Sequence, residues 1–352
     1  MKICYLIPSL AKKGPNNVVA DLVSVLYKKH EISVFYFNEF EGDKIELPCE
    51  TKKISLKDIN CLKYFDIVHS HMLKPDLFVF ICKVLSYFKF GKKNNYKSTT
   101  TLHQIDVINL SYDYKSKLVG HGISYLWRLM LSLHDSCICI NEQMLKYYKK
   151  RLLVKEILCI YNGRSFSSVN EKYKLSLKND RIKLVTCCLL TERKGLDQVI
   201  RVLPSLPNVE FIIIGDGPEK KQLENLARKF NCSSRVIFKG FVSNPQKELL
   251  DSDAFILPSR GEGFPLSLLE AASLSLPCIS SNLDMLVDAF DPSEISFFKL
   301  ENLDSLERAI HNCLGNLNSY SKNINDKYNN LFTKEIMSEN YNNHYLDLLE
   351  KN

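Results

Sequence analysis

The sequence predicts an α/β protein with two doubly wound domains, each built on a parallel sheet. Short β-branched or aromatic runs alternate with longer segments of helical period, a rhythm typical of parallel sheets that helices cover on both faces. The chain has 352 residues, of which 45% are hydrophobic, so it is long enough for two cores of ordinary size. The same strand-and-helix series occurs twice, which favours two domains over one.

The first series begins at the amino terminus. Strands are predicted at 2–9, 31–37 and 66–72, with helices at 17–29 and 75–88 between and after them. The apolar run at 2–9 lacks the small-residue cleavage site of a secretory signal peptide, so we interpret it as the first strand. No stretch reaches the roughly 18 to 20 apolar residues that a membrane-spanning helix needs.

The second series begins after a polar stretch at 160–180 that has no sustained apolar period. Its strands are predicted at 182–190, 209–217, 235–241 and 254–259, with helices at 195–206, 218–230, 245–253 and after Pro265. We therefore predict domains at 1–165 and 166–334. Ligands of open parallel sheets bind beyond the carboxyl ends of the strands, so two facing sheets would form a cleft lined by strand-to-helix loops.

Charge is unevenly distributed between the two halves. Residues 1–180 hold 28 Lys+Arg against 17 Asp+Glu, net +11, whereas residues 181–352 hold 19 against 23, net −4. A basic half favours an anionic partner. Segments 83–97 and 144–155 mix lysines with aromatic residues and could rest on an anionic membrane surface, although solvated helix faces are an equal alternative. Nucleic acid is disfavoured, because no nucleic-acid module appears and the second half is acidic.

The twelve cysteines include no C-x-x-C pair and no disulfide-type spacing. This usage is typical of a reducing cytosol, where a free cysteine behaves as a small buried hydrophobe. We therefore expect a cytoplasmic protein, with a peripheral position on the inner face of the membrane as an extension of that expectation.

The stretch 259–277 carries the strongest signal for chemistry. Glu262 lies in a loop after a buried strand, and Glu270 lies about a turn and a half into the helix that we expect to begin at Pro265. The amino terminus of that helix offers unpaired N–H groups that suit a phosphate. One of the two carboxylates could then reach hydroxyls on one side of a bound diphosphate, and the other carboxylate could reach hydroxyls on the far side. The alternative is a pair of solvated surface glutamates.

Other loops at the same predicted sheet edges carry weaker signals. Arg193 and Lys194 precede a helix and could neutralise a diphosphate leaving group, although a basic solvated turn is the commoner case. Gly14, between the first strand and the first helix, would let the backbone approach a ligand closely. His103 follows a Thr-rich strand and would face the cleft, although a lone histidine is more often structural.

Several of these motifs, taken in order, resemble a known family. The succession "ERKG", "IIIGDGPE", "RVIFKGFV" and "LPSRGEGFPLSLLEAASLSLPCISS" is similar to that of the retaining glycosyltransferases of family 4, with the E-x7-E motif at Glu262 and Glu270. The likeness is specific from about Leu184 to Asp288. It continues more weakly through the first half at "GPNNVVADL", "DIVHSH", "TTTLHQ" and "IYNG".

The resemblance implies a GT-B fold, with an acceptor-binding N-terminal domain, a nucleotide-sugar-binding C-terminal domain, and a last helix at about 335–352 that packs back on the first. It implies that Glu270 binds the ribose and that Lys194, assisted by Arg193, clamps the phosphates. It also implies that the sugar and the diphosphate are lined by Glu262 and by the backbone of Gly263, Phe264, Pro265 and Leu266. His103 would lie near the transferred sugar, Gly14 would approach the diphosphate, and Phe241 would meet the base.

One departure from the family pattern affects the phosphate site. Members commonly have Gly followed by Arg or another polar residue before the RKG element, and Cys188 and Leu189 stand there instead. A lost charge-assisted contact would cost on the order of 1.5 to 3 kcal/mol. The family needs no metal, and no cofactor is expected. "DSD" at 251–253 resembles a metal-binding D-x-D, but a turn at the end of a helix is favoured there. His69 and His71 could bind a metal as a pair, but packing or acceptor-side roles are favoured for them.

These observations predict a retaining, metal-independent glycosyltransferase that moves a sugar from a UDP-sugar, rather than a GDP-sugar, to a glycan acceptor. By analogy with the family, the acceptor would be a lipid-linked oligosaccharide of O antigen, capsule or lipopolysaccharide. A catalytically weak nucleotide-sugar-binding subunit that supports a partner enzyme is the alternative, motivated by Leu189. Epimerase or phosphorylase chemistry on the same fold fits the motifs less well.

Overall fold

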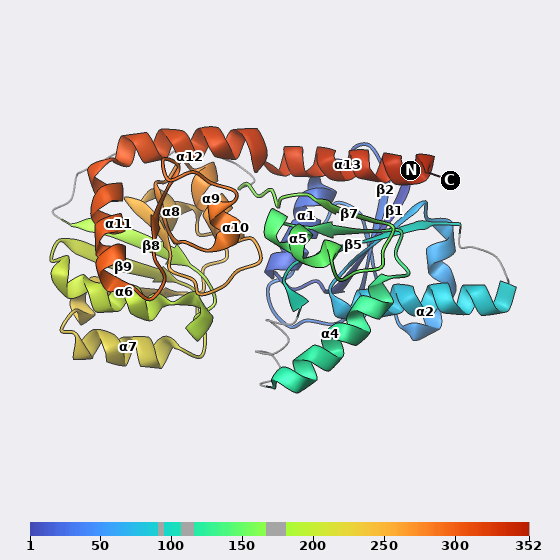
Figure 1. Cartoon of the computed structure of the whole chain (residues 1–352), viewed down its shortest axis with the longest axis horizontal. Coiled ribbons are helices and arrows are strands. Elements are labelled where there is room, and N and C mark those ends of the chain that lie inside the picture. The colour runs from blue at the N-terminus through green and yellow to red at the C-terminus, as the bar shows by residue number, and fades with distance from the viewer. Residues whose placement is uncertain (91–94, 107–115, 167–180, 352) are drawn as a thin grey trace. The chain divides into compact units, whose positions relative to one another are not determined.

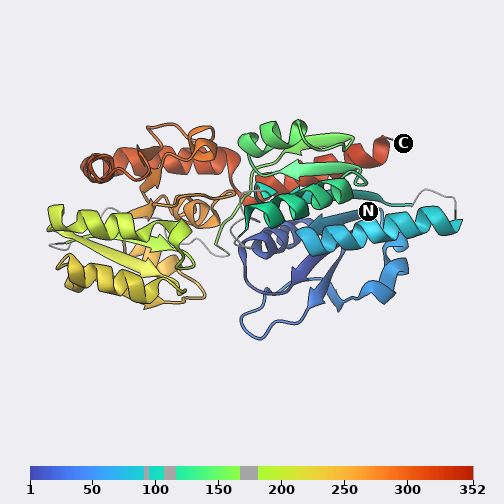
Figure 2. The same ribbon diagram turned by 60° about the horizontal axis from the view of Figure 1, so that its bottom comes forward.

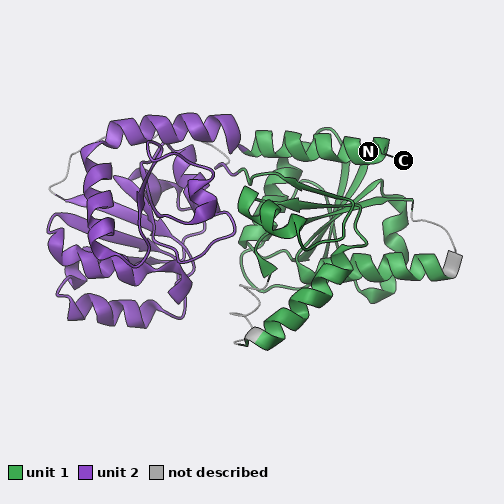
Figure 3. Cartoon of the chain, in the orientation of Figure 1, with its two compact units in different colours: residues 1–163, 334–352 green, residues 164–333 purple. Residues whose placement is uncertain are grey.

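The computed structural model describes residues 1–90, 95–106, 116–166 and 181–351. They divide into two compact units, residues 1–163 with 334–352, and residues 164–333 (Figure 3). The first break falls after Gly163, where the sequence predicted a break after residue 165. Parts of the predicted boundary stretch and of the predicted basic segment, at 167–180 and 91–94, lie outside the described residues.

The first unit is built on a seven-stranded parallel sheet in the order β3-β2-β1-β4-β5-β6-β7. Its strands are β1 (Lys2–Ser9), β2 (Glu31–Asn38), β3 (Glu50–Lys53), β4 (Ile67–His71), β5 (Lys97–Leu102), β6 (Ser136–Cys139) and β7 (Glu156–Cys159). Every residue of β4 is buried, whereas every residue of β3 is exposed. A central parallel strand needs cover on both faces, and the edge strand does not.

Helices cover both faces of this sheet. They are α1 (Gly14–Leu26), η1 (Leu56–Tyr64), α2 (Leu73–Phe90), α4 (Lys117–Leu131), α5 (Glu142–Lys149) and α13 (Lys334–Glu350). Helix α13 packs beside α1, and α2 packs beside α4 on the opposite face (Figures 1 and 2). The hydroxyl of Tyr345 on α13 lies 3.1 Å from that of Tyr5 on β1. The last helix therefore packs on the first unit, as the family resemblance implied.

The second unit is built on a six-stranded parallel sheet in the order β10-β9-β8-β11-β12-β13. Its strands are β8 (Ile182–Cys187), β9 (Val209–Ile214), β10 (Val236–Gly240), β11 (Ala254–Leu257), β12 (Cys278–Ser281) and β13 (Ile295–Phe298). Its helices are η2 (Glu192–Lys194), α6 (Leu196–Val202), η3 (Leu203–Ser205), α7 (Lys220–Lys229), η4 (Ser233–Arg235), α8 (Gln246–Leu250), α9 (Leu266–Ser273), α10 (Asp284–Val287), α11 (Leu303–Gly315) and α12 (Leu317–Leu331). Helices α6 and α7 pack together, as do α9 and α12 on the other side (Figure 1).

Two predicted helix starts are off by a few residues. Helix α9 begins at Leu266, and Pro265 precedes it as the extended N-cap residue. Helix α1 begins at Gly14, three residues before the predicted start, with Pro15 in its first turn. Among the described residues, no helix combines the length and the apolar character needed to cross a membrane.

Candidate active site

In the second unit, the loops after β8 and β11 meet around Glu262. The Nζ of Lys194 donates to Oε1 of Glu262 at 2.6 Å, and the hydroxyl of Ser259 donates to the same oxygen at 2.7 Å. A guanidinium nitrogen of Arg193 lies 3.8 Å from Oε2. The sequence therefore predicted correctly that one loop carries both cations, and the structure adds that they contact the first glutamate of the E-x7-E pair.

The Glu262 carboxylate is buried, with only 7% of its side chain exposed. Burial would raise the pKa of this carboxyl, but Lys194 and Arg193 beside it hold that pKa below its ordinary value. The cluster is therefore a set of fixed charges, with the cations close to a buried anion. Such preorganised charges can stabilise a departing diphosphate without rearranging when the negative charge develops.

Close backbone packing holds these two loops together. Gly195 adopts a left-handed conformation with φ of 64°, and a Cβ there would lie 2.1 Å from the carbonyl oxygen of Pro258. The guanidinium of Arg260 donates to both carboxylate oxygens of Asp197, at 2.9 and 3.0 Å. The backbone N–H of Arg260 also donates to the carbonyl of Arg193 at 2.7 Å. The positions of Arg193 and Lys194 are thus fixed by the neighbouring loop.

Glu270 lies on the first turns of α9 and is buried. Its Oε1 accepts a hydrogen bond from Nε of Arg164 at 2.9 Å. Sequence reasoning did not single out Arg164, which stands 106 residues away in the chain, in the polar stretch that we interpreted as a boundary. A carboxylate has about four acceptor sites, so Glu270 can keep this ion pair and still accept a ribose hydroxyl.

Cys187 and Cys188 lie at the end of β8, near the two glutamates. Burial, and then the Glu270 carboxylate, raise the pKa of the Cys187 thiol to about 12. Burial raises the pKa of the Cys188 thiol to about 11, with Lys194 opposing and Glu262 adding to that rise. Both thiols are neutral at physiological pH. The electrostatic influence of each glutamate on one of these cysteines places both carboxylates near the carboxyl end of β8.

The amino terminus of α9 is held by aromatic packing. Phe264 is buried and its ring lies 5.5 Å from that of Phe332 and 6.5 Å from that of Phe290. Its side chain therefore anchors the loop at the start of α9. No side chain caps the start of α9, and the N–H of Leu268 donates to the carbonyl of Pro265 at 3.2 Å. Among the described residues, the N–H groups of Leu266 and Ser267 have no hydrogen-bond acceptor.

The G-x-G turn after β9 supports the loop that begins at Cys188. Gly215 has φ of 128°, and a Cβ there would lie 1.9 Å from the carbonyl oxygen of Cys188. The N–H of Leu190 donates to the carbonyl of Asp216 at 2.9 Å. This turn therefore has a packing role. Phe241 follows β10 at the same sheet edge and is exposed, so its contact with the base stays a prediction.

In the first unit, His103 follows β5 and contacts His71 at the end of β4. Nε2 of His103 lies 2.9 Å from Nδ1 of His71, whose ring stacks on His69 at 4.3 Å between centroids. Burial lowers the pKa of His103 to about 3 and holds those of His71 and His69 well below their ordinary value. All three imidazoles are therefore neutral at physiological pH, and Nδ1 of His103 has no hydrogen-bond partner among the described residues.

The remaining residues singled out from the sequence have structural partners or open surroundings. Both ring nitrogens of His69 are engaged, by the hydroxyls of Tyr345 at 2.6 Å and Thr101 at 2.8 Å, which favours packing over metal binding. Asp253 accepts from the N–H of Lys183 at 2.8 Å, a structural role. Gly14 is exposed, with open space around it. In the described part of the chain, no group of three or more His, Cys, Asp or Glu side chains is placed to hold a metal ion. Metal independence itself stays a prediction.

Comparison with known proteins agrees with these features. A family model described as "Glycosyl transferases group 1" matches residues 169–329. The O-antigen biosynthesis glycosyltransferase WclY of Escherichia coli is 31% identical over all of this chain and 99% of its own length. The UDP-Gal:alpha-D-GlcNAc-diphosphoundecaprenol alpha-1,3-galactosyltransferase of the same organism is 32% identical over 41% of this chain and 38% of that protein.

Among solved structures, Anabaena HepE in complex with UDP-glucose matches with a TM-score of 0.81 at 16% identity, over 99% of this chain and all of that one. This likeness confirms the predicted fold class, two Rossmann-like parallel-sheet domains of the GT-B type. The resemblance to family 4 is confirmed at the level of the family and its glycosyltransferase activity. The full-length match to WclY settles membership: this chain belongs to the glycosyltransferase group 1 family.

Proposed function

We propose that the protein is a retaining glycosyltransferase that moves a sugar from a UDP-sugar to a lipid-linked glycan in the synthesis of O antigen, lipopolysaccharide or capsule. WclY acts in O-antigen biosynthesis by its name, and the galactosyltransferase named above uses UDP-Gal and a diphosphoundecaprenol acceptor. HepE was solved with UDP-glucose. These relatives support a UDP-sugar over a GDP-sugar and a lipid-linked acceptor. We extend the proposal to a cytoplasmic protein that meets its acceptor at a membrane.

The observation that carries the proposal is the contact of Lys194 and Arg193 with buried Glu262, just before the amino terminus of α9. In the proposed reaction, the bond between the anomeric carbon and the diphosphate breaks, and the acceptor oxygen bonds to the same face of that carbon. The two cations and the first N–H groups of α9 stabilise the departing diphosphate. One of its oxygens takes the proton of the acceptor hydroxyl, and no protein nucleophile is needed.

Other residues position the donor and the transferred sugar. Glu270, held by Arg164, binds the ribose, and Glu262 with the backbone of residues 263–266 lines the sugar and diphosphate. Neutral His103 donates to or accepts from a sugar hydroxyl through Nδ1. The contacts of Gly14 with the diphosphate and of Phe241 with the uracil stay predictions from the family resemblance.

Release of UDP from a panel of UDP-sugars, with and without lipid-linked acceptor, tests the proposal. We expect acceptor-dependent release that Glu270→Gln weakens through donor affinity by about tenfold, the value of a charge-assisted hydrogen bond. Glu224→Gln, on α7 of the same unit, serves as the matched control. If Glu270→Gln keeps wild-type donor affinity, the ribose role is wrong.

The alternative is a nucleotide-sugar-binding subunit with weak catalysis that supports a partner enzyme. Leu189 favours it, because this side chain is 63% exposed and supplies no charge where the family commonly has a polar residue. Tight donor binding without turnover on any acceptor would support this alternative, and turnover would exclude it.

A further inference from the structure

Helix α4 carries an apolar face that is exposed in the part of the unit that the structure describes. Its members are 40% to 87% exposed: Leu118, Val119, Tyr125, Leu126, Leu129 and, just beyond the helix, Leu133. We call this set the α4 stripe. At 100° per residue its members fall on one side of the helix, while Trp127 and Leu131 on the opposite side are buried. A contiguous exposed apolar surface with no Lys, Arg, Asp or Glu among its members indicates an interaction site.

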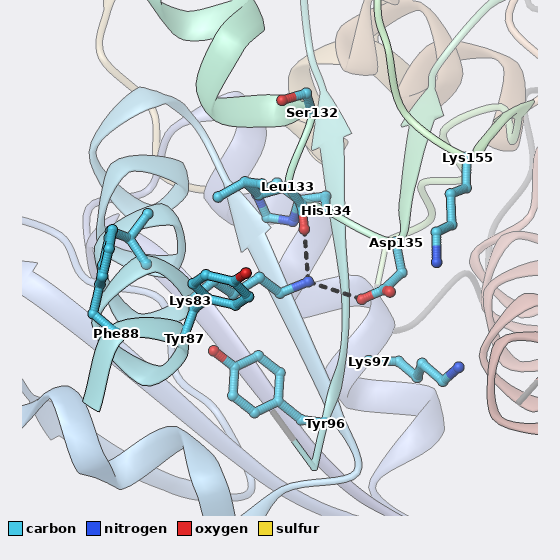
Figure 4. Close-up of a pocket in the computed structure, with 11 residues that line it drawn as sticks. Lys83, Tyr87, Phe88, Tyr96, Lys97, Ser132, Leu133, His134, Asp135 and Lys155 are labelled. Atoms are coloured by element: carbon cyan, nitrogen blue, oxygen red, sulfur yellow. Dashed lines mark hydrogen bonds and ion pairs between the residues drawn. The ribbon is translucent and has the colours of Figure 1, made fainter. Parts of the chain in front are cut away.

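The α4 stripe ends at a cavity of about 520 Å³, to which Leu133 also contributes (Figure 4). Lys83, Lys97 and Lys155 line this cavity, with Tyr87 and Phe88 from α2 on one side. We call it the cationic pocket. It lies where β5, β6 and β7 begin, and His103 follows the opposite end of β5, so the pocket is separate from the candidate active site.

The cationic pocket keeps a net positive charge after its internal ion pair is counted. Nζ of Lys83 donates to Asp135 at 2.9 Å and to the carbonyl of Leu133 at 2.7 Å. The N–H of Ser98 donates to the same Asp135 oxygen at 2.8 Å. The Asp135 charge is therefore satisfied by these donors. Nζ of Lys97 donates to the carbonyl of Lys351 at 2.6 Å, and neither Lys97 nor Lys155 forms an ion pair with a described residue.

A buried histidine adds an unused hydrogen-bonding group. His134 lines the cationic pocket and is buried, and neither of its ring nitrogens has a hydrogen-bond partner among the described residues. Its Nε2 lies 3.8 Å from the Asp76 carboxylate, so Nδ1 is the ring nitrogen that a ligand atom could satisfy. The positive charge of the pocket comes from its lysines.

We propose that the α4 stripe and the cationic pocket form a docking surface for a bilayer that contains anionic phospholipid. A phospholipid presents a negative phosphate next to apolar chains, which matches a cationic pocket at the end of an apolar stripe. Helix α4, about 22 Å long, would lie in the interface with its stripe among the acyl chains. Exposed Tyr87 and Phe88 would enter the same layer beside the headgroup.

A second copy of the chain fits this surface less well. In a twofold dimer through the α4 stripe, the same surface would face itself, and the stripe offers no Asp or Glu to pair with the lysines of the cationic pocket. The membrane proposal deepens the proposed function, on which it rests for the lipid-linked acceptor. Vesicle binding is measured without donor or acceptor, so its failure is distinguishable from a failure of sugar transfer.

Sedimentation with vesicles tests the docking surface on the full chain. We expect binding to phosphatidylcholine vesicles that contain phosphatidylglycerol, much weaker binding to phosphatidylcholine alone, and weakening by salt. Leu126→Glu should lower the partition coefficient at least about tenfold. Lys155→Gln should lower it roughly fivefold, the usual effect of one cation at an anionic surface.

Matched controls separate docking from folding and from total charge. Leu56 on η1 is 60% exposed against 56% for Leu126, so Leu56→Glu makes the same change elsewhere in the unit. Lys229→Gln on α7 removes a lysine from the second unit. Both controls should bind vesicles like the wild type. Because Trp127 is present in every variant, quenching is compared with that of the wild type. Brominated lipid should quench the fluorescence that Leu126→Trp adds and not the fluorescence that Leu56→Trp adds.

Three outcomes would overturn the proposal. One is a folded wild-type protein, verified by circular dichroism, that does not sediment with anionic vesicles at low salt. The second is equal loss of binding in Leu126→Glu and Leu56→Glu. The third is concentration-dependent dimerisation that Leu126→Glu abolishes without any vesicle binding, which would assign the α4 stripe to a second copy.

Discussion

The two units differ in how the polar groups at the carboxyl ends of their strands are stabilised. In the second unit, Lys194 pairs with Glu262 and Arg164 with Glu270, so ionised groups are balanced in pairs. In the first unit, His103 and His71 form a hydrogen bond between buried neutral rings. One edge is organised around charge and the other around neutral hydrogen bonding.

This contrast fits two different ligands. A diphosphate needs cations that are already in place, whereas sugar hydroxyls need donors and acceptors that carry no net charge. The histidines are also unequally distributed between the two units. Only His311 lies in the second unit, and the other seven histidines lie in the first. The two units should therefore respond differently to acid, to loss of a charge and to gain of a charge.

Mild acid should destabilise the first unit most. Burial lowers the pKa of His103 and of His134 to about 3, so the folded state binds fewer protons than the unfolded state below pH 6.5. The stability from these neutral rings is complete above about pH 6.5 and is lost as the pH falls towards 3, at a cost of about 2 kcal/mol per ring at pH 5.

A buried carboxyl opposes part of this loss. Burial raises the pKa of Asp76 to about 6, so its protonation in the folded state returns about 1 kcal/mol at pH 5. The chain's single tryptophan, Trp127, reports on the first unit. Two urea midpoints are compared at pH 7.5 and pH 5. The midpoint of the first unit, read by tryptophan fluorescence, should fall by more than the midpoint of the second unit, read as a separate transition by circular dichroism. Equal shifts of both transitions would contradict the contrast.

Loss of one cation should disable the second unit. Lys194→Met removes a contact to the leaving group and should lower kcat/KM for UDP release by about 100-fold or more. It also leaves the Glu262 carboxylate buried, with the Ser259 hydroxyl and the more distant Arg193 as its partners among the described residues, which destabilises the unit. The double variant Lys194→Met/Glu262→Gln should regain stability but not activity. Wild-type turnover by Lys194→Met would show that this cation does not act on the diphosphate.

Much of this contrast was accessible from the sequence, and the reasons differ by region. Strands such as β9 were predicted because the run at 209–214 is apolar on both faces, as a central parallel strand requires. Strand β3 was missed because "ETKK" at the sheet edge is fully exposed and carries no apolar pattern. Lys194 and Glu262 were found through a motif resemblance that links two distant loops.

Arg164 could not be found in that way. Its partner Glu270 is 106 residues away, and nothing in the local pattern at the unit boundary distinguishes an ion-pairing arginine from a solvated one. The contact of His71 with His103 was hidden for a similar reason, because it depends on the register of β4 against β5, which places Thr101 beside His71. Long-range pairing sets both contacts.

The neutral network of the first unit should tolerate a change that keeps its hydrogen bond. In His71→Asn, the side-chain amide can occupy the place of Nδ1, whereas His71→Leu removes the partner of Nε2 of His103. One lost hydrogen bond is worth up to about tenfold in rate, so the Leu variant should lose about that much in kcat at unchanged donor KM. The Asn variant should keep most of the rate, and equal losses in both would contradict an orienting role.

A charge added to the second unit should have the smallest effect. Leu189→Arg places a cation at the position where the family commonly has a polar residue, but this side chain is exposed, so water and salt screen its attraction for the diphosphate. We expect UDP to bind about two- to fivefold more tightly by calorimetry at low salt. That gain should shrink in high salt, and Leu189→Gln, which adds polarity without charge, should not reproduce it. If Leu189→Arg binds UDP no better than the wild type, the phosphate site needs no further cation and the motive for a weakly catalytic subunit disappears.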